Sequence, residues 1–157
     1  MSDSSGILKS GEMAGRLAEA LDREKSGKTY GAAGATLRKS WAEARKAALA
    51  QYARGDALVA KLAAVMDEAV ATLAKQAIMS LPPGSKIAAV ATGGFGRSQL
   101  APLSDIDLLI LHTGLSEDAL KTFANALLYP LWDAGLVVGH AAHTPASAVK
   151  FAETDMT

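Results

Sequence analysis

The sequence predicts an α+β fold in which N-terminal helices are followed by a small mixed sheet. Two long stretches before residue 80 repeat apolar residues at helical spacing. Three short apolar runs with the length of strands follow a Pro-Pro-Gly breaker at 82–84. Half of the 157 residues are apolar, which is enough for a sizeable core. We therefore expect a poorly ordered segment at 1–35, a helical region at 36–80 and an α/β core at 81–157.

The helical region is expected to contain two helices separated by Gly55, a residue that favours a helix end. The first helix runs from Thr36 to about Ala53, and the second from about Ala57 to Met79 with a broader apolar stripe. The segment before them is rich in Gly, Ser, Lys and Glu and contains a single short helical patch.

Three strands are expected after the breaker, at Lys86–Ala91, Asp105–His112 and Leu136–Ala142. Ser116 has the features of an N-cap because two acidic residues follow it in the first turn. The helix that begins there is expected to reach Asp133 or the residue before it. The second strand, this helix and the third strand would then form a βαβ-like half.

The composition excludes several classes of protein and site. The chain has no cysteine, which excludes disulfides, thiolate metal sites and cysteine nucleophiles. Its formal net charge of zero makes nucleic acid an improbable partner, because duplex binding needs a broad basic surface. No apolar run is long enough to span a bilayer, and the first fifteen residues lack the apolar segment of a signal peptide. We therefore expect a cytoplasmic protein without a membrane partner.

The strongest chemical signal lies between residues 92 and 110. Gly93 and Gly94 follow the first expected strand, and a glycine turn lets backbone N–H groups approach a phosphate without a Cβ between them. Asp105 and Asp107 are two residues apart, so on an extended segment they would face the same side. Two neighbouring carboxylates are costly to desolvate without a cation, and hard oxygen ligands suit Mg²⁺. The pattern predicts a nucleotide site with Asp105 and Asp107 as metal ligands.

Two further residues are candidates for nucleotide binding, and each has a structural alternative. Arg97 would contact the triphosphate and neutralise charge, or it is an ordinary surface arginine. Ser104 would touch a phosphate, or it caps the turn before the second strand.

The glycine turn followed about ten residues later by Asp-x-Asp resembles the DNA polymerase β-like nucleotidyltransferase superfamily. The stretches Gly93–Ile110, Tyr129–Leu136 and Val138–His140 resemble more narrowly the N-terminal transferase domain of bifunctional enzymes that uridylylate the nitrogen-regulatory protein PII and remove that modification. The resemblance covers most of the chain from about Leu37. It implies that 81–157 is a nucleotidyltransferase core of that type, incomplete at its C-terminal end.

The resemblance implies an Mg²⁺-dependent enzyme that transfers UMP from UTP to a tyrosine of a PII-type protein and releases pyrophosphate. The family's hydrolase domain and its glutamine-sensing domains do not fit within 157 residues, so the effector glutamine would act through domains outside this chain. Two alternatives stay open. One is a nucleotidyltransferase with a different acceptor, for example one that transfers AMP. The other is a regulatory nucleotide-binding module of the same fold without catalysis.

The general base is not assigned by the sequence. The superfamily normally adds a third carboxylate from a later strand, whereas the corresponding strand here ends in Gly139-His140 without an acid. His140 is a candidate for positioning or deprotonating the acceptor, because the ordinary pKa of histidine suits that role. A structural histidine at a strand end is the alternative.

Overall fold

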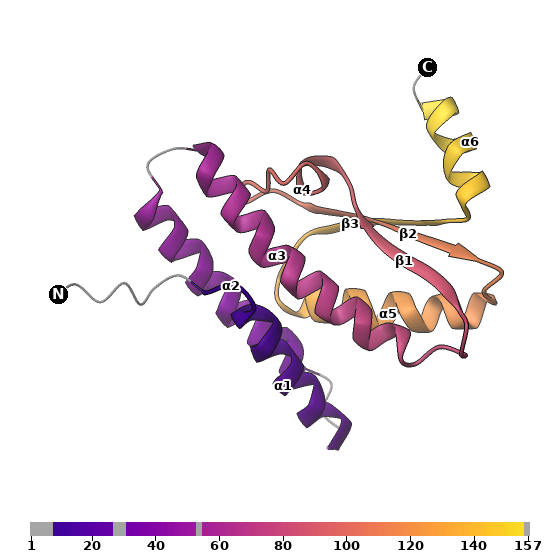
Figure 1. The fold of residues 1–157 in the computed structure, drawn as a ribbon, viewed down its shortest axis with the longest axis horizontal. Coiled ribbons are helices and arrows are strands. Elements are labelled where there is room, and N and C mark those ends of the chain that lie inside the picture. Colours follow the sequence, from indigo (N-terminus) through magenta and orange to yellow (C-terminus); the bar gives the residue numbers. More distant parts are fainter. Residues whose placement is uncertain (1–7, 27–30, 53–54, 156–157) are drawn as a thin grey trace.

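The computed structural model describes residues 8–26, 31–52 and 55–155 and has the predicted α+β architecture. Three long helices precede a three-stranded sheet, as Figure 1 shows. The helices are α1 (Glu12–Ser26), α2 (Ala32–Gln51), α3 (Gly55–Ile78), α4 (Gly93–Gly96), α5 (Glu117–Asp133) and α6 (Pro145–Asp155), and the strands are β1 (Lys86–Ala91), β2 (Ile106–Thr113) and β3 (Val138–His143).

The N-terminal segment differs from the expectation of poor order at 1–35. Helix α1 occupies much of this segment, and its side chains Met13 and Leu17 are fully buried. Their burial against the other helices offsets the entropy lost on ordering the helix. Residues 1–7 and 27–30 lie outside the described part of the chain, so the expectation stays a prediction there.

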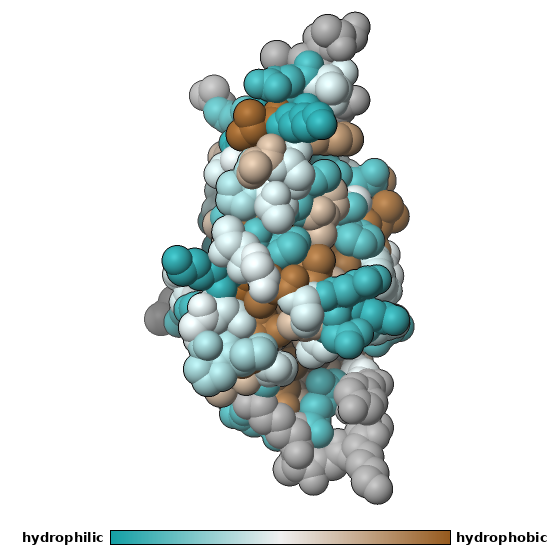
Figure 2. All heavy atoms as spheres, turned by 90° about the vertical axis from the view of Figure 1, so that its right-hand side faces the viewer, coloured by the Kyte–Doolittle hydropathy of each residue, from teal (hydrophilic) through white to brown (hydrophobic). Residues whose placement is uncertain are grey.

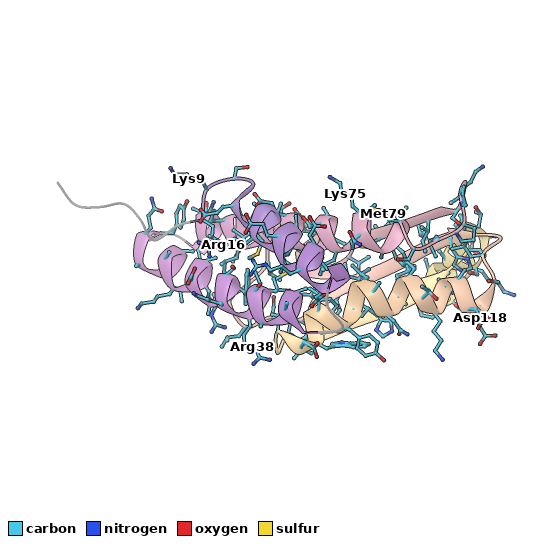
Figure 3. The ribbon with its side chains drawn as sticks, turned by 90° about the horizontal axis from the view of Figure 1, so that it is seen from below. Lys9, Arg16, Arg38, Lys75, Met79 and Asp118 are labelled. Atoms are coloured by element: carbon cyan, nitrogen blue, oxygen red, sulfur yellow. The ribbon has the colours of Figure 1, made fainter. Side chains whose placement is uncertain are left out.

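Polar contacts attach α1 to the two helices behind it. The N–H of Gly11 donates to Oε1 of Glu68 on α3 at 2.8 Å. Arg16 pairs with Glu43 on α2 at 2.7 Å and donates to the buried hydroxyl of Ser40 at 3.2 Å. These contacts join residues more than twenty positions apart, so no local pattern predicts them. Figure 3 shows Arg16 among the helices.

Helices α2 and α3 confirm the two predicted helices, but Gly55, which was expected to end the first of them, is instead the first residue of α3. Helix α2 also begins four residues earlier than expected, at Ala32. The reason is a cap supplied from another helix. Oε1 of Glu24 on α1 accepts the N–H groups of Gly31 and Ala33, each at 2.9 Å. A carboxylate at a helix N-terminus satisfies N–H groups that have no partner within the helix.

The sheet has the order β1-β2-β3, with β1 and β2 antiparallel and β2 and β3 parallel. The expected βαβ half is present as β2, α5 and β3. Helix α5 begins as predicted, because Ser116 Oγ accepts the N–H of Ala119 at 3.2 Å. Helices α3 and α5 lie on one side of the sheet, and α6 extends from the other side (Figure 1).

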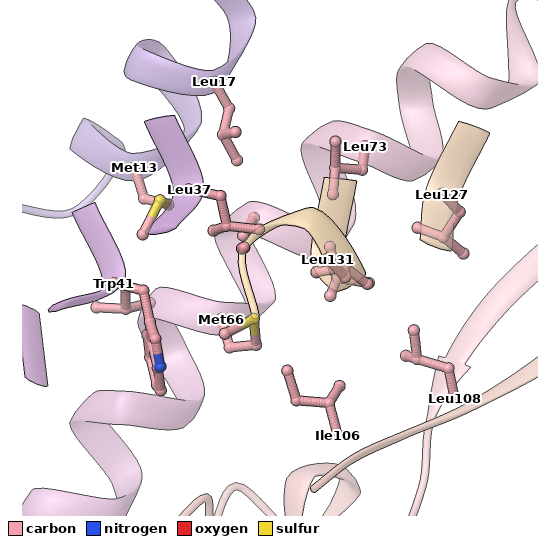
Figure 4. Close-up of a cluster of buried hydrophobic side chains, with 14 of the residues drawn as sticks. Met13, Leu17, Leu37, Trp41, Met66, Leu73, Ile106, Leu108, Leu127 and Leu131 are labelled. Atoms are coloured by element: carbon pink, nitrogen blue, oxygen red, sulfur yellow. The ribbon is translucent and has the colours of Figure 1, made fainter. Parts of the chain in front are cut away.

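Alternation along β2 separates a core face from an open face. Ile106, Leu108 and Ile110 are at most 2% exposed and face the helices. Asp107 and Leu109 point the other way and are half-buried. The core joins β2 to helices on both sides of residue 80, as Figure 4 shows; its labelled members are Met13, Leu17, Leu37, Trp41, Met66, Leu73, Ile106, Leu108, Leu127 and Leu131.

The end of the sheet where β1 begins and β2 ends bears a shallow hollow of about 530 Å³, lined in part by Pro82, Lys86, Thr113 and Ser116. Figure 2 faces this end and shows apolar surface in its middle with polar side chains around it. Asp107 lies near the opposite end of β2, so this hollow is separate from the candidate site. Within the described residues, no helix is long and apolar enough to cross a membrane.

Candidate functional site

The glycine turn lies directly beside the start of β2. After β1 ends, the N–H of Thr92 donates to the carbonyl of Asp107 at 2.9 Å. The chain then forms the single turn of α4, whose first hydrogen bond runs from the N–H of Gly96 to Thr92 at 2.8 Å. Gly93 and Gly94 come before Gly96 in the chain, so their N–H groups lie ahead of the first hydrogen bond of α4. The structure therefore brings the predicted phosphate-binding turn to the predicted metal ligand Asp107.

The carboxylate of Asp107 lies between two glycines, Gly93 at the start of α4 and Gly139 on β3. A Cβ built on Gly93 would lie 2.5 Å from Oδ2 of Asp107, and one built on Gly139 would lie 2.7 Å from Oδ1. Gly139 is the partner of Asp107 in the parallel register of β2 and β3. The carboxylate therefore occupies space that any other residue at either position would fill.

Asp105 is placed differently from Asp107. It precedes the first residue of β2 and is exposed, whereas Asp107 is half-buried within the strand. The N–H of Ile106, between them, donates to the carbonyl of Val137 at 2.9 Å and holds this edge of the loop against the chain before β3. Within the described residues, neither carboxylate has a hydrogen bond or an ion pair, so both are available to a cation.

A metal ion here would need ligands from outside the protein. The described part of the chain contains no group of three His, Cys, Asp or Glu side chains arranged to hold one. Mg²⁺ suits such a site, because it commonly binds through one or two carboxylates and takes its other ligands from water and substrate phosphates. The donors present therefore fit a nucleotide-associated Mg²⁺.

The accessory candidates Arg97 and Ser104 lie in the loop between the glycine turn and Asp105. The side chain of Arg97 is exposed just after α4. The hydroxyl of Ser104 donates to the carbonyl of Ala101 at 3.2 Å, which is the capping role given as its alternative. Both residues are near the turn in sequence, and their contact with a phosphate stays a prediction.

The loop 97–105 is attached to the helices by contacts that sequence reasoning missed. The side chain of Leu100 is 1% exposed, and its N–H donates to the carbonyl of Val59 on α3 at 3.3 Å. Arg45 on α2 donates to the carbonyl of Pro102 at 3.4 Å. The one available signal was an apolar residue, Leu100, next to a polar stretch. Helices α2 and α3 therefore support the loop that carries Asp105.

His140 is not brought to the carboxylates. In the register of β3 it neighbours Leu108, which faces the helices, so its side chain is on the opposite face of the sheet from Asp107. Its ring has an edge contact with Trp132 of α5, with centroids 5.7 Å apart. The structural alternative accounts for this placement. Gly139, the residue before it, faces Asp107 instead and was not among the predicted site residues.

The chain is similar to curated bifunctional uridylyltransferase/uridylyl-removing enzymes. It is 38% identical to the enzyme of Gluconobacter oxydans (strain 621H) over 128 residues, which is 81% of this chain and 13% of that protein. It is 41% identical to the enzyme of Bordetella avium (strain 197N) over 121 residues, covering 73% of this chain and 13% of that protein. It is 46% identical to the Streptomyces coelicolor enzyme over 70 residues, covering 45% and 8%.

The chain thus spans 13% or less of the length of these three relatives. No protein-family model matches it, and no solved structure does.

Proposed function

This chain belongs to the family of bifunctional uridylyltransferase/uridylyl-removing enzymes, and on that premise we propose that it transfers UMP from UTP to a tyrosine hydroxyl of a PII-type protein. Pyrophosphate is the other product. The observation that carries the proposal is the carboxylate of Asp107, which lies beside the glycine turn without a partner among the described residues. The proposed substrates place the reaction in the cytoplasm. Glutamine is proposed as the effector of the reaction.

Transfer of a nucleotidyl group depends chiefly on positioning and on neutralising charge. Mg²⁺ held by Asp105 and Asp107 would supply charge neutralisation at the phosphates of the nucleotide. Gly93 and Gly94 leave their backbone N–H groups open to phosphate oxygens, because no side chain stands in front of them. The exposed guanidinium of Arg97 is the proposed contact for the remaining phosphate charge. Ser104 is proposed to turn its hydroxyl from the Ala101 carbonyl, to which it donates in the structure, toward the same phosphates when a nucleotide binds.

One observation favours a second candidate, a nucleotide-binding regulatory module without catalysis. No third carboxylate accompanies Asp105 and Asp107 within the described residues, and His140 faces away from them. A site of this kind would bind UTP with Mg²⁺ and would leave the acceptor hydroxyl without a base.

Calorimetric titration of the chain with UTP, with and without Mg²⁺, tests the site. We expect Mg²⁺-dependent binding that is lost in Asp107→Asn and retained in Asp118→Asn, an exposed carboxylate in the first turn of α5, beyond the end of β2 opposite Asp107. ATP as a competitor tests the choice of base. Absence of UTP binding by the folded chain would overturn the proposal.

Incubation with UTP labelled at the α-phosphate and a PII-type protein then separates the two candidate functions. Label on a tyrosine of the acceptor supports the transferase. Binding of UTP without any transfer supports the regulatory module.

A further inference from the structure

The backbone conformation at Gly139 does not require a glycine. It lies in the interior of β3, where glycine is unfavourable because it adds chain entropy and no packing. Unlike Gly93, which has a φ of +58°, Gly139 does not adopt the left-handed conformation. A strand glycine without a conformational requirement indicates a close approach by another group.

That other group is the Asp107 carboxylate. A Cβ on Gly139 would lie 2.7 Å from Oδ1 and 3.8 Å from Cγ of Asp107, and it would meet no other atom within 4 Å. The clash thus involves only the end of a flexible side chain. An alanine at this position can be accommodated by moving the carboxylate, whereas the backbone of β3 has no need to move.

We propose that Gly139 is a positioning residue for the Asp107 carboxylate and that its missing side chain makes the site selective for Mg²⁺ over Ca²⁺. Mg²⁺ requires nearly ideal octahedral geometry with ligands at about 2.0–2.1 Å, whereas Ca²⁺ accepts six to eight ligands at about 2.3–2.6 Å. A displaced carboxylate therefore harms the binding of Mg²⁺ more than that of Ca²⁺. The inference rests on the proposed metal–nucleotide site, and it adds the residue that sets the position of the Asp107 carboxylate in that site.

The test compares Gly139→Ala with Gly15→Ala in the full chain. A Cβ on Gly15 meets nothing within 4 Å, and its φ is outside the left-handed region, so this variant controls for a glycine-to-alanine change by itself. The affinities for Mg²⁺ and for Ca²⁺ are measured by titration in the presence of UTP. We expect Gly139→Ala to weaken Mg²⁺ binding by about ten- to a hundredfold, the range known for disturbing the surroundings that orient a metal ligand, and to weaken Ca²⁺ binding clearly less. Gly15→Ala should leave both affinities unchanged.

A second measurement tests the contact without any metal. Unfolding in urea is compared for Gly139→Ala in the wild-type background and in an Asp107→Ala background, where the carboxylate is gone. We expect Gly139→Ala to be less favourable for stability in the first background than in the second, by the cost of moving the carboxylate. A variant that folds only in the second background supports the contact equally.

Two results would overturn the inference. One is an unchanged ratio of Mg²⁺ to Ca²⁺ affinity in Gly139→Ala while the wild-type chain binds Mg²⁺ with UTP, which leaves the proposed function standing. The other is an equal cost of Gly139→Ala in both backgrounds, because the substitution then acts without Asp107. Failure of the wild-type chain to bind Mg²⁺ with UTP would instead remove the proposed function and the selectivity with it.

Discussion

Three glycines at or near the candidate site are required for three different physical reasons. Gly93 has a φ of +58°, which an L-residue adopts only with strain, and it also approaches Oδ2 of Asp107. Gly139 is limited only by the Asp107 side chain. Gly96 is limited by backbone, because a Cβ there would lie 2.5 Å from the carbonyl oxygen of Ala91. Substitutions at these positions should therefore have distinguishable effects.

Gly96→Ala should destabilise the chain by about 1–3 kcal/mol, because neither the α4 turn nor the end of β1 can yield without losing its own hydrogen bonds. Gly15→Ala, near the start of α1 with open space around it, should instead stabilise the chain by about 0.4–1 kcal/mol. Urea unfolding measures both values. Equal stability of Gly96→Ala and the wild-type chain would show that the α4 turn has room for a side chain beside the carbonyl of Ala91.

At the scale of elements, the loop between α4 and β2 depends on the helices. Leu100 is almost fully buried and anchors the loop, whereas Leu103 in the same loop is 87% exposed. The position of Asp105 is therefore linked to α3 through Leu100 and its hydrogen bond to Val59.

Leu100→Ala should lower the free energy of unfolding by about 2–5 kcal/mol, the usual cost of removing a buried leucine side chain. It should also weaken Mg²⁺-dependent UTP binding, because the loop that carries Asp105 loses its anchor. Leu103→Ala is the matched control and should change neither quantity. Urea unfolding and calorimetry provide the measurements, and equal effects of the two substitutions would contradict the anchoring role.

The N-terminal end of α1 has a pH dependence of defined sign. The N–H of Lys9 donates to the Glu12 carboxylate at 3.0 Å, and this bond, together with Arg16, holds the pKa of Glu12 below its ordinary value of 4.5. A carboxyl whose pKa is lowered on folding stabilises the protein above the unfolded-state pKa, and this stabilisation is lost as the pH falls through the folded-state pKa.

Glu12→Gln should therefore be less stable than the wild-type chain at pH 7, and the difference should shrink as the pH falls below the ordinary pKa of glutamate. Thermal unfolding across this pH range is the measurement. Glu19→Gln serves as the control, because its ion pair with Arg23 is long, 3.7 Å, and exposed. A difference that grows in acid would contradict the assigned sign.

At the scale of the whole molecule, the helices and the sheet share one core. The expected boundary at residue 80 separates helices from strands along the chain, whereas the buried residues of α2 and α3 pack against those of α5 and β2 (Figure 4). Gly34 on α2 illustrates how close this packing is, because a Cβ there would lie 2.5 Å from the Cβ of Asp133 on α5. Arg38 on α2 also donates to the carbonyl of Asp133.

A shared core predicts one cooperative unfolding transition. The two tryptophans report on different parts of it, since Trp41 is buried on α2 and Trp132 is partly exposed on α5 beside the sheet. In Trp132→Phe the fluorescence reports on Trp41, and in Trp41→Phe it reports on Trp132. In each variant the urea transition followed by fluorescence should coincide with the transition followed by circular dichroism. Two separate midpoints within one variant would mean that the helices and the sheet unfold independently.

Local sequence signals were enough to predict α2, α3, α5 and the three strands, and to single out the glycine turn and Asp-x-Asp as the candidate site. Apolar periodicity and the Pro-Pro-Gly breaker placed α2, α3 and the three strands, with β1 at its observed bounds, because these signals are local. The proximity of the glycine turn to Asp107 followed from the order of strand, turn and strand. Ser116 marked the start of α5 for the same local reason.

Three features depend on tertiary contacts. They are the formation of α1 as an ordered helix, the early start of α2 and the face of the sheet to which each β3 residue points. The first two depend on hydrogen bonds accepted by Glu68 on α3 and by Glu24 on α1, each of which contacts the start of another helix. The third depends on register, because a shift of one residue exchanges Gly139 and His140 between the faces of the sheet. Pairing between distant segments fixes that choice, and no local pattern in β3 carries it.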